Sequence, residues 1–257
     1  MRGRGREVLL FCIVVGAGVW LRAAPASVGV GATAVECPSV AEVGTLPRWP
    51  HGGLLRADVD GDSRTDTVTI RYAPAAPVSC SFILVVQARG RTLSLPIRED
   101  YKGLDWSGRK WPFQEPVVEA IVKLGGTAAQ VVVATSGGAS NENVELFGIV
   151  RGRLRFLSVG QRGEITLYGS AGTGVTSAQC QLGGPLSVVS EWPTASGPTA
   201  LWGFTRTDYR MRGARFNATD TRTIKGSQMV IDRLSRAAGI GEGHQFKRCA
   251  LASMRGF

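Results

Sequence analysis

The stretch that decides the fold is Asp58-Val59-Asp60-Gly61-Asp62-Ser63-Arg64-Thr65-Asp66, which runs directly into Thr67-Val68-Thr69-Ile70-Arg71-Tyr72. Carboxylates occupy the first, third, fifth and ninth positions of this stretch. Two like charges about 4 Å apart repel each other by roughly 4 kcal/mol at an effective dielectric constant near 20. Such crowding calls for a counter-charge, and the alternating β-branched residues that follow predict a β-strand.

A hard divalent cation would supply that counter-charge, because calcium takes six to eight oxygen ligands from carboxylates and backbone carbonyls. Alternate positions of a tight loop aim their side chains at one point, so the loop predicts a calcium site leading into a strand. The predicted ligands are Asp58, Asp60, Asp62, the backbone carbonyl of Arg64, and Asp66. The alternative is a solvated acidic turn that is neutralised by Arg56, Arg64 and Arg71.

The pattern Asp-x-Asp-Gly-Asp-x-x-x-Asp before a strand resembles the calcium loop of FG-GAP/VCBS-type repeats, which occur in integrin-α-like propellers and many secreted bacterial proteins. The resemblance covers residues 58–72 and implies bound calcium and repeats that pack as propeller blades. A helix-loop-helix calcium site would need glutamate at its twelfth position, where Thr69 stands. The glycine that usually follows the third acid is Ser63 here, so we expect Gly61 to make the turn.

The strand pattern around the loop recurs with a spacing of roughly 64 residues. We expect three degenerate repeats, at about 54–97, 118–159 and 163–223. The second repeat keeps the strands and lacks the acids; in their place stand Gly125, Gly126, Thr127 and Gln130. This repeat cannot bind calcium through a carboxylate shell.

These repeats predict a mostly β fold of antiparallel β-meanders that resemble propeller blades. Three units are few for a closed propeller, which usually has four to eight blades, so we expect a partial or irregular propeller. Residues 35–257 would form this single β-rich domain, including a tail after the third repeat. The tail contains one predicted short helix, from Ser227 to Ala238, which Gly239 would end.

The first 34 residues have the layout of a secretory signal. Arg2, Arg4 and Arg6 precede an apolar run from Val8 to Leu21, and small residues follow. Cleavage is expected after residues 24–26 or 32–34, and a retained N-terminal anchor is the alternative. No later segment is apolar enough to span a membrane, so the mature chain is predicted to be secreted or held at the cell envelope.

The cysteines fit an exported protein. Removing the signal leaves Cys37, Cys80, Cys180 and Cys249, an even number in an oxidising compartment. We expect Cys37–Cys80 and Cys180–Cys249, because each bond then stays within one half of the chain. A zinc site is disfavoured because the sequence has no Cys-x-x-Cys pair.

The formal net charge is +10 for the whole chain; residues 1–34 contain four Arg and one Glu, a net +3, so the rest carries +7. The basic residues are scattered, and an exported protein meets no genome, so nucleic acid is not an expected partner. The candidates are a cell-wall polymer, a glycan or another envelope protein.

Enzymatic activity is the weaker hypothesis, and no catalytic residue is assigned. The chain has only two histidines, His51 and His244, and no nucleophile elbow. An exported glycan or peptidoglycan hydrolase remains the alternative to a binding or structural module, with Trp106 and Trp111 as a substrate platform. Its acids would come from residues 98–145, namely Glu99, Asp100, Asp105, Glu115, Glu142 and Glu145.

Overall fold

The computed structural model describes residues 37–97, 115–126, 128–138, 141–160, 165–171, 174–194, 201–238, 246 and 248–254. Val35–Phe257 form one compact unit. The expected signal segment and the aromatic platform at Trp106 and Trp111 lie outside the described residues. Within the described ranges, no helix is both long enough and apolar enough to cross a membrane.

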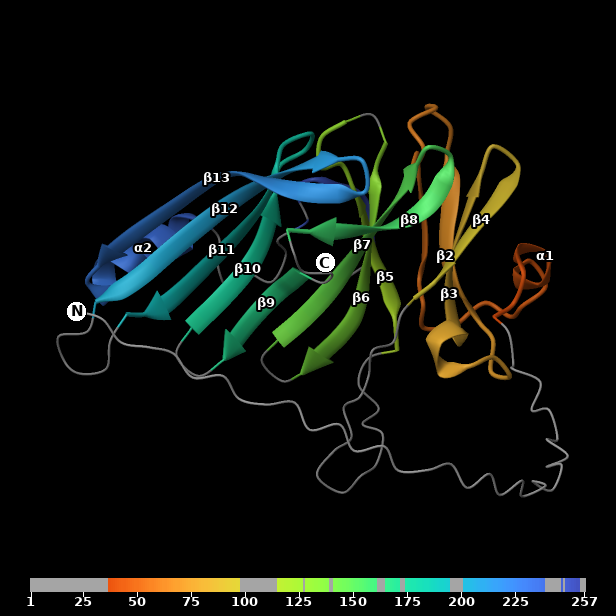
Figure 1. Ribbon diagram of the computed structural model, residues 1–257, viewed down its shortest axis with the longest axis horizontal. Coiled ribbons are helices and arrows are strands. Elements are labelled where there is room, and N and C mark those ends of the chain that lie inside the picture. The colour runs from red at the N-terminus through yellow and green to blue at the C-terminus, as the bar shows by residue number, and fades with distance from the viewer. Residues whose placement is uncertain are drawn as a thin grey trace, which may run out of the picture. The chain divides into compact units, whose positions relative to one another are not determined.

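The first sheet is a four-stranded antiparallel meander (Figure 1). Its strands, in spatial and chain order, are β1 (Leu54–Ala57), β2 (Asp66–Tyr72), β3 (Phe82–Ala88) and β4 (Arg91–Pro96). Arg89 and Gly90 connect β3 to β4 with φ of 52° and 69°. Two successive positive φ values characterise the type I′ turn, whose twist matches that of the strands it joins. Strands β3 and β4 therefore form a tight two-residue hairpin.

The second sheet has ten strands, in the order β14-β5-β6-β7-β8-β13-β12-β11-β10-β9. Their bounds are β5 (Val117–Val122), β6 (Gln130–Gly138), β7 (Asn141–Val150), β8 (Arg153–Val159), β9 (Ile165–Ala171), β10 (Gly174–Cys180), β11 (Leu186–Pro193), β12 (Trp202–Arg212), β13 (Arg215–Gly226) and β14 (Ala250–Ser253). Strands β5 to β8 form one antiparallel meander and strands β9 to β13 another, joined by a parallel contact between β8 and β13. The predicted mostly β fold of repeated antiparallel meanders is confirmed.

Strand β7 makes this sheet curl, because two strands share one of its edges. Strand β6 pairs along residues 141–148 of β7. The opposite edge is divided between β9, at residues 141–144, and β8, at residues 146–150. The two meanders therefore diverge from one strand, and the sheet bends into a half-barrel (Figure 1).

The two sheets pack face to face, as neighbouring propeller blades do. One cluster of buried residues unites the inner face of the first sheet with β5 to β8; its members include Val68, Ile70, Leu84, Val131, Val133 and Phe147. A second cluster fills the concave side of the curled sheet and includes Leu146, Leu157, Leu186 and Phe216. Strand β3 and residues 130–135 of β6 are buried on both faces, which explains the apolar runs at residues 82–86 and 131–134 without alternation.

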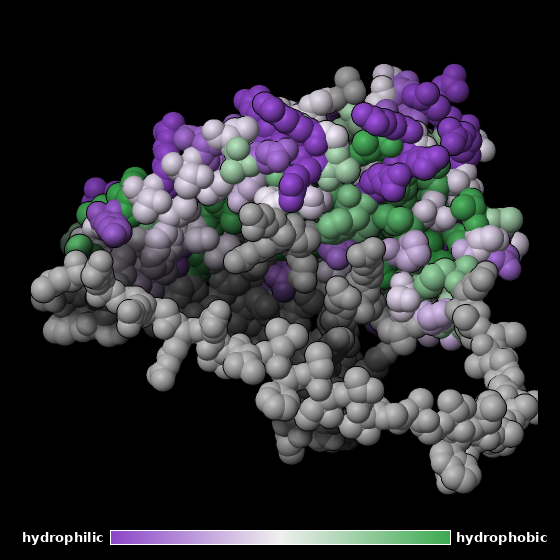
Figure 2. All heavy atoms as spheres, viewed as in Figure 1, coloured by the Kyte–Doolittle hydropathy of each residue, from purple (hydrophilic) through white to green (hydrophobic). Residues whose placement is uncertain are grey.

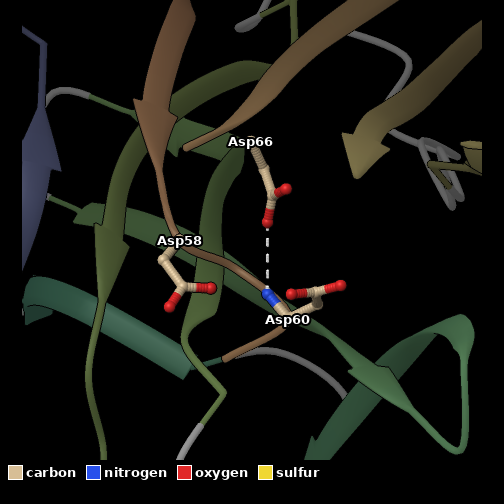
Figure 3. Close-up of side chains that lie close together, drawn as sticks. All are labelled: Asp58, Asp60 and Asp66. Carbon is tan, nitrogen blue, oxygen red and sulfur yellow. Dashed lines mark hydrogen bonds between the residues drawn. The ribbon is translucent and has the colours of Figure 1, made fainter. Parts of the chain in front are cut away.

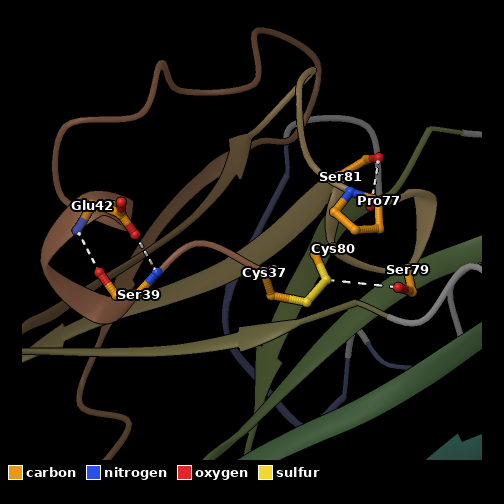
Figure 4. The surroundings of a disulfide bond; sticks show 7 residues. All are labelled: Cys37, Ser39, Glu42, Pro77, Ser79, Cys80 and Ser81. Atoms are coloured by element: carbon orange, nitrogen blue, oxygen red, sulfur yellow. Dashed lines mark hydrogen bonds between the residues drawn. A yellow bond between two sulfur atoms is a disulfide. The ribbon is translucent and has the colours of Figure 1, made fainter. Parts of the chain in front are cut away.

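Two α-helices lie outside the sheets. Helix α2 (Gln228–Ala237) confirms the predicted C-terminal helix and packs Ile231 on Val189 and Phe204. Helix α1 (Val40–Val43) was not predicted from the sequence. It begins with a capping box between Ser39 and Glu42 (Figure 4).

Both predicted disulfides are present. Cys37 is bonded to Cys80, which ends the short 3-10 helix η1 (Val78–Cys80) (Figure 4). Cys180 is bonded to Cys249. The paired Cα atoms lie 5.5 and 5.8 Å apart, within the usual range for a disulfide. The first bond links the segment just before helix α1 to the segment between β2 and β3, and the second links the segment before β14 to the end of β10.

Candidate functional site

The acidic loop connects β1 to β2, as predicted. The two strands pair antiparallel up to Ala57 and Asp66, so residues 58–65 close a hairpin. Gly61 has a φ of 82° and Ser63 a φ of 68°. Gly61 thus makes the turn as expected, and Ser63 also adopts the left-handed conformation that glycine would occupy more easily. No helix precedes or follows the loop, which is the context of a strand-associated site.

Asp58 organises the first half of the loop through backbone amides. One of its carboxylate oxygens, Oδ1, accepts hydrogen bonds from the N–H groups of Gly61 at 2.7 Å and Asp62 at 3.1 Å. The other oxygen accepts from the N–H of Ser63 at 2.8 Å. These bonds hold the turn in its left-handed conformation and stabilise the charge of the carboxylate.

Asp66 closes the loop from its C-terminal end. Its side chain is 2% exposed, and its Oδ2 accepts hydrogen bonds from the N–H groups of Val59 at 2.8 Å and Asp60 at 3.2 Å. Burial raises the pKa of Asp66, the two hydrogen bonds oppose this rise, and the charges of Asp60 and Asp58 add to it. A nearby positive charge would lower the pKa of Asp66 further toward its usual value.

Asp58, Asp60 and Asp66 converge in space (Figure 3). Each offers one carboxylate oxygen, and these oxygens all lie within 4.8 Å of one another. Calcium–oxygen bonds are about 2.3–2.6 Å long, so two ligands of one ion are separated by at most about 5 Å. The all-oxygen donor set suits calcium and not zinc, which prefers nitrogen and sulfur. The three side chains therefore fit a calcium ion.

Asp62 is not part of this converging group. Its Oδ2 lies 3.0 Å from the Nε of Arg89, which also lies 2.7 Å from Oδ2 of Asp60. Its Oδ1 accepts from the backbone N–H of Arg64. Among the described residues, Arg89 is thus the cation paired with the loop. The alternative hypothesis placed Arg56, Arg64 and Arg71 as the counter-charges. In the described part of the chain the ion pairs of the loop are instead with Arg89, and the Nη1 of Arg71 donates to the carbonyl of Leu46.

The second unit closes the equivalent turn with a neutral side chain. Gln130 opens β6 as Asp66 opens β2, and it is fully buried. Its Oε1 accepts a 2.8 Å hydrogen bond from the N–H of Leu124. Gly125 and Gly126 supply the left-handed residues, with φ of 79° and 76°. An amide therefore makes the same kind of contact that Asp66 makes, without a charge.

A buried glutamate that was not predicted, Glu119, lies on the second sheet and interacts with the half-buried Glu142. Glu119 lies in β5 and is 9% exposed; Glu142 lies in β7. Burial raises the pKa of Glu119 to about 8, and the charge of Glu142 contributes to the rise. Burial also raises the pKa of Glu142. A signal was available, since Glu119 is the one charged residue in the apolar strand Val-Val-Glu-Ala-Ile-Val.

The other acids of the hydrolase hypothesis are placed differently. Glu99, Asp100 and Asp105 lie outside the described residues. Glu115 is exposed, and Glu145 is half-buried on β7. Of the acids proposed from sequence, Glu142 is the one among the described residues whose charge acts on the buried Glu119.

Comparisons with known proteins add little to this geometry. No protein-family model matches the chain, and no curated protein matches it significantly. A solved structure from Xanthomonas, of a protein described as related to the type IV secretion system, is 14% identical over 68% of this chain and 98% of its own, with a TM-score of 0.26. No argument about fold or function rests on that likeness.

Proposed function

We propose that this protein is a secreted, calcium-stabilised β-repeat module of the FG-GAP/VCBS type, with a binding or structural role at the cell envelope. The observation that carries the proposal is the convergence of carboxylate oxygens from Asp58, Asp60 and Asp66 within 4.8 Å at the start of β2. The two disulfides are consistent with export, since such bonds persist in oxidising compartments. Asp62 and the carbonyl of Arg64 would complete the shell after a small rearrangement of the Arg89 contact.

The loop is placed to stabilise more than its own hairpin. Val59 lies inside the acidic loop, is fully buried in the core between the sheets, and accepts a 3.1 Å hydrogen bond from the N–H of Ala129 in the second unit. Bound calcium would supply positive charge that offsets the repulsion among the acids. The loop residues would then hold β1, β2 and the β5–β6 connection in fixed register.

A basic surface on β12 and β13 supports the binding role. Alternation along β12 places Arg206, Arg210 and Arg212 on one face, opposite Arg222, Asn217 and Arg215 of β13. Hydrophilic residues gather over these strands in the space-filling view (Figure 2). Only Asp208 and Asp220 offset the five arginines by ion pairing on that face, within the described residues. Such a surface suits an anionic envelope polymer, because arginine binds phosphate and carboxylate groups with two hydrogen bonds.

The calcium proposal is tested by thermal unfolding in millimolar calcium and in EGTA. For a dissociation constant of about 10⁻⁴–10⁻³ M, 1 mM calcium stabilises the protein by roughly 0.4–1.4 kcal/mol. That gain raises the melting temperature by about 1–5 °C for a domain of this size. Asp60→Asn should abolish the difference, whereas Asp220→Asn, at an exposed acid outside the loop, should preserve it. Identical wild-type melting in the two conditions would refute calcium binding.

Buried Glu119, whose pKa is raised by burial and by the charge of the half-buried Glu142, supports a second candidate, an exported glycan or peptidoglycan hydrolase. A carboxyl group kept protonated near neutral pH is what a general acid requires, and a second carboxylate is the usual partner. The test is hydrolysis of purified peptidoglycan and glycans by the wild type and by Glu119→Gln. Activity that the substitution abolishes while the fold persists would favour the enzyme; no turnover by the wild type would exclude it.

A further inference from the structure

Strand β13 has a long free edge. It pairs with β12 from Arg215 to Gly226, but its other edge contacts β8 only through Arg215 and Phe216. No other described strand pairs with it. Residues 218–225 are all exposed, on both faces of the strand. A free edge of this length presents unpaired backbone N–H and C=O groups to any strand that can align with it.

The side chains along this edge carry charges of both signs, and the edge contains no proline that would remove a backbone N–H. Residues 220–226 contain no proline and three β-branched residues, Thr221, Thr223 and Ile224, so this part of the strand is competent to pair. The register against β12 shifts just before it, at Thr219. Asp220 and Arg222 lie two positions apart, and the Nε of Arg222 lies 2.9 Å from Oδ2 of Asp220. The two opposite charges therefore occupy one face, on either side of Thr221.

We propose that a second copy of this chain pairs with this edge, β13 against β13, antiparallel about a two-fold axis at Thr221. In this register Asp220 of one protomer lies opposite Arg222 of its partner, and the reverse pair forms on the other side of the axis. Thr221 lies opposite its own copy, a favourable cross-strand pair. The charges of the edge become self-complementary, and the backbone groups of both edges gain partners.

The same charges exclude the neighbouring registers. A slip that keeps the two faces aligned must move the strand by an even number of residues. One such slip places Asp220 opposite Asp220, and the opposite slip places Arg222 opposite Arg222. Like charges directly opposite each other are destabilising. This selection for a single symmetric register argues for a second copy of the chain as the occupant and against an unrelated extended peptide.

The test is sedimentation equilibrium of the full chain over a range of concentrations. The wild type should show a reversible monomer–dimer equilibrium. Asp220→Arg and Arg222→Asp each place like charges at both symmetric pairs, so each should weaken dimerisation by at least about tenfold. An equimolar mixture of the two variants should form heterodimers as tightly as the wild type, because opposite charges then face each other again. The double variant D220R/R222D should also dimerise.

Matched controls separate the charge pattern from net charge and folding. Glu115→Arg and Arg91→Asp make the same charge changes at exposed positions away from β13, and both should dimerise like the wild type. Circular dichroism and thermal unfolding should show that all variants keep the fold. A monomeric wild type, single variants that dimerise normally, or a mixture that fails to recover would each overturn the proposal.

Discussion

Replacement of Glu119 by glutamine tests how this buried glutamate titrates. The folded state raises the pKa of Glu119 from 4.5 to about 8, first through burial and then through Glu142. Between these values the folded protein binds a proton that the unfolded chain has already released. Stability is therefore fully present below pH 4.5 and is lost as the pH rises toward 8, because the slope of unfolding free energy with pH is negative where the folded state binds more protons.

The magnitude follows from the same two values. At about 1.4 kcal/mol per pKa unit, the difference between 4.5 and about 8 corresponds to roughly 5 kcal/mol. At pH 7 about 3 kcal/mol of this loss has already occurred. Because glutamine mimics the protonated acid, Glu119→Gln should match the wild type near pH 4.5 and exceed its stability by several kcal/mol at pH 9.

The assay is urea unfolding at pH 5, 7 and 9, followed by tryptophan fluorescence with both disulfides oxidised. The difference between variant and wild type cancels groups that titrate in both, such as Asp66. Glu142→Gln should lower the pKa of Glu119 and so give a smaller gain of the same sign. Exposed Glu115→Gln is the control, with no expected change. A wild-type to Glu119→Gln difference that stays constant from pH 5 to pH 9 would show that Glu119 does not titrate in this window.

Three further substitutions probe the turns. Ser63→Gly should stabilise the protein by about 0.5–1 kcal/mol in urea unfolding, because Ser63 has a φ of 68°; a loss of stability would contradict the strain. Gln130→Leu should cost about 1–3 kcal/mol in the same assay, since the N–H of Leu124 loses its buried acceptor; an unchanged midpoint would show that the hydrogen bond is dispensable. Arg89→Gln should cost less than about 1 kcal/mol without calcium, because Arg89 is largely exposed. It should tighten calcium binding several-fold in titration calorimetry by removing a competing cation, and weaker binding would contradict that competition.

Local sequence signals were sufficient to predict several strands and turns, although strand β14 in the tail was not predicted. The alternating residues after Asp66, the Arg89–Gly90 turn and the amphipathic stretch of α2 each depend on neighbours in the chain. The disulfides were predictable because four cysteines allow few pairings, and pairing within each half keeps the closed loops short. Helix α1 was missed because four residues carry too little periodicity, although the Ser39–Glu42 capping box was visible in the sequence.

Contacts between distant residues were not predictable in this way. Arg89 reaches Asp60 because β2 pairs with β3, which brings the β3–β4 turn beside the β1–β2 loop. Once the meander is assumed, this neighbour could have been inferred, but the alternative hypothesis considered only arginines close to the loop in sequence, namely Arg56, Arg64 and Arg71. The Glu119–Glu142 pair depends on the pairing of β5, β6 and β7. The free edge of β13 depends on where β8 stops pairing, which only the assembled sheet determines.

Asp66 and Gln130 separate the structural role of the loop from the proposed ionic one. Both residues open the second strand of a unit, both are buried, and both accept backbone N–H groups from the preceding turn. The amide shows that this closure needs no charge. Burial of a carboxylate in the same place raises its pKa, and repulsion from the charges of Asp60 and Asp58 raises the pKa of Asp66 further. The charged form of Asp66 gains two hydrogen bonds from the N–H groups of Val59 and Asp60, which oppose the effect of burial on its pKa. The remaining repulsion from Asp58 and Asp60 is what the proposed calcium ion would offset, and the second unit, with its neutral Gln130, has no such repulsion to offset.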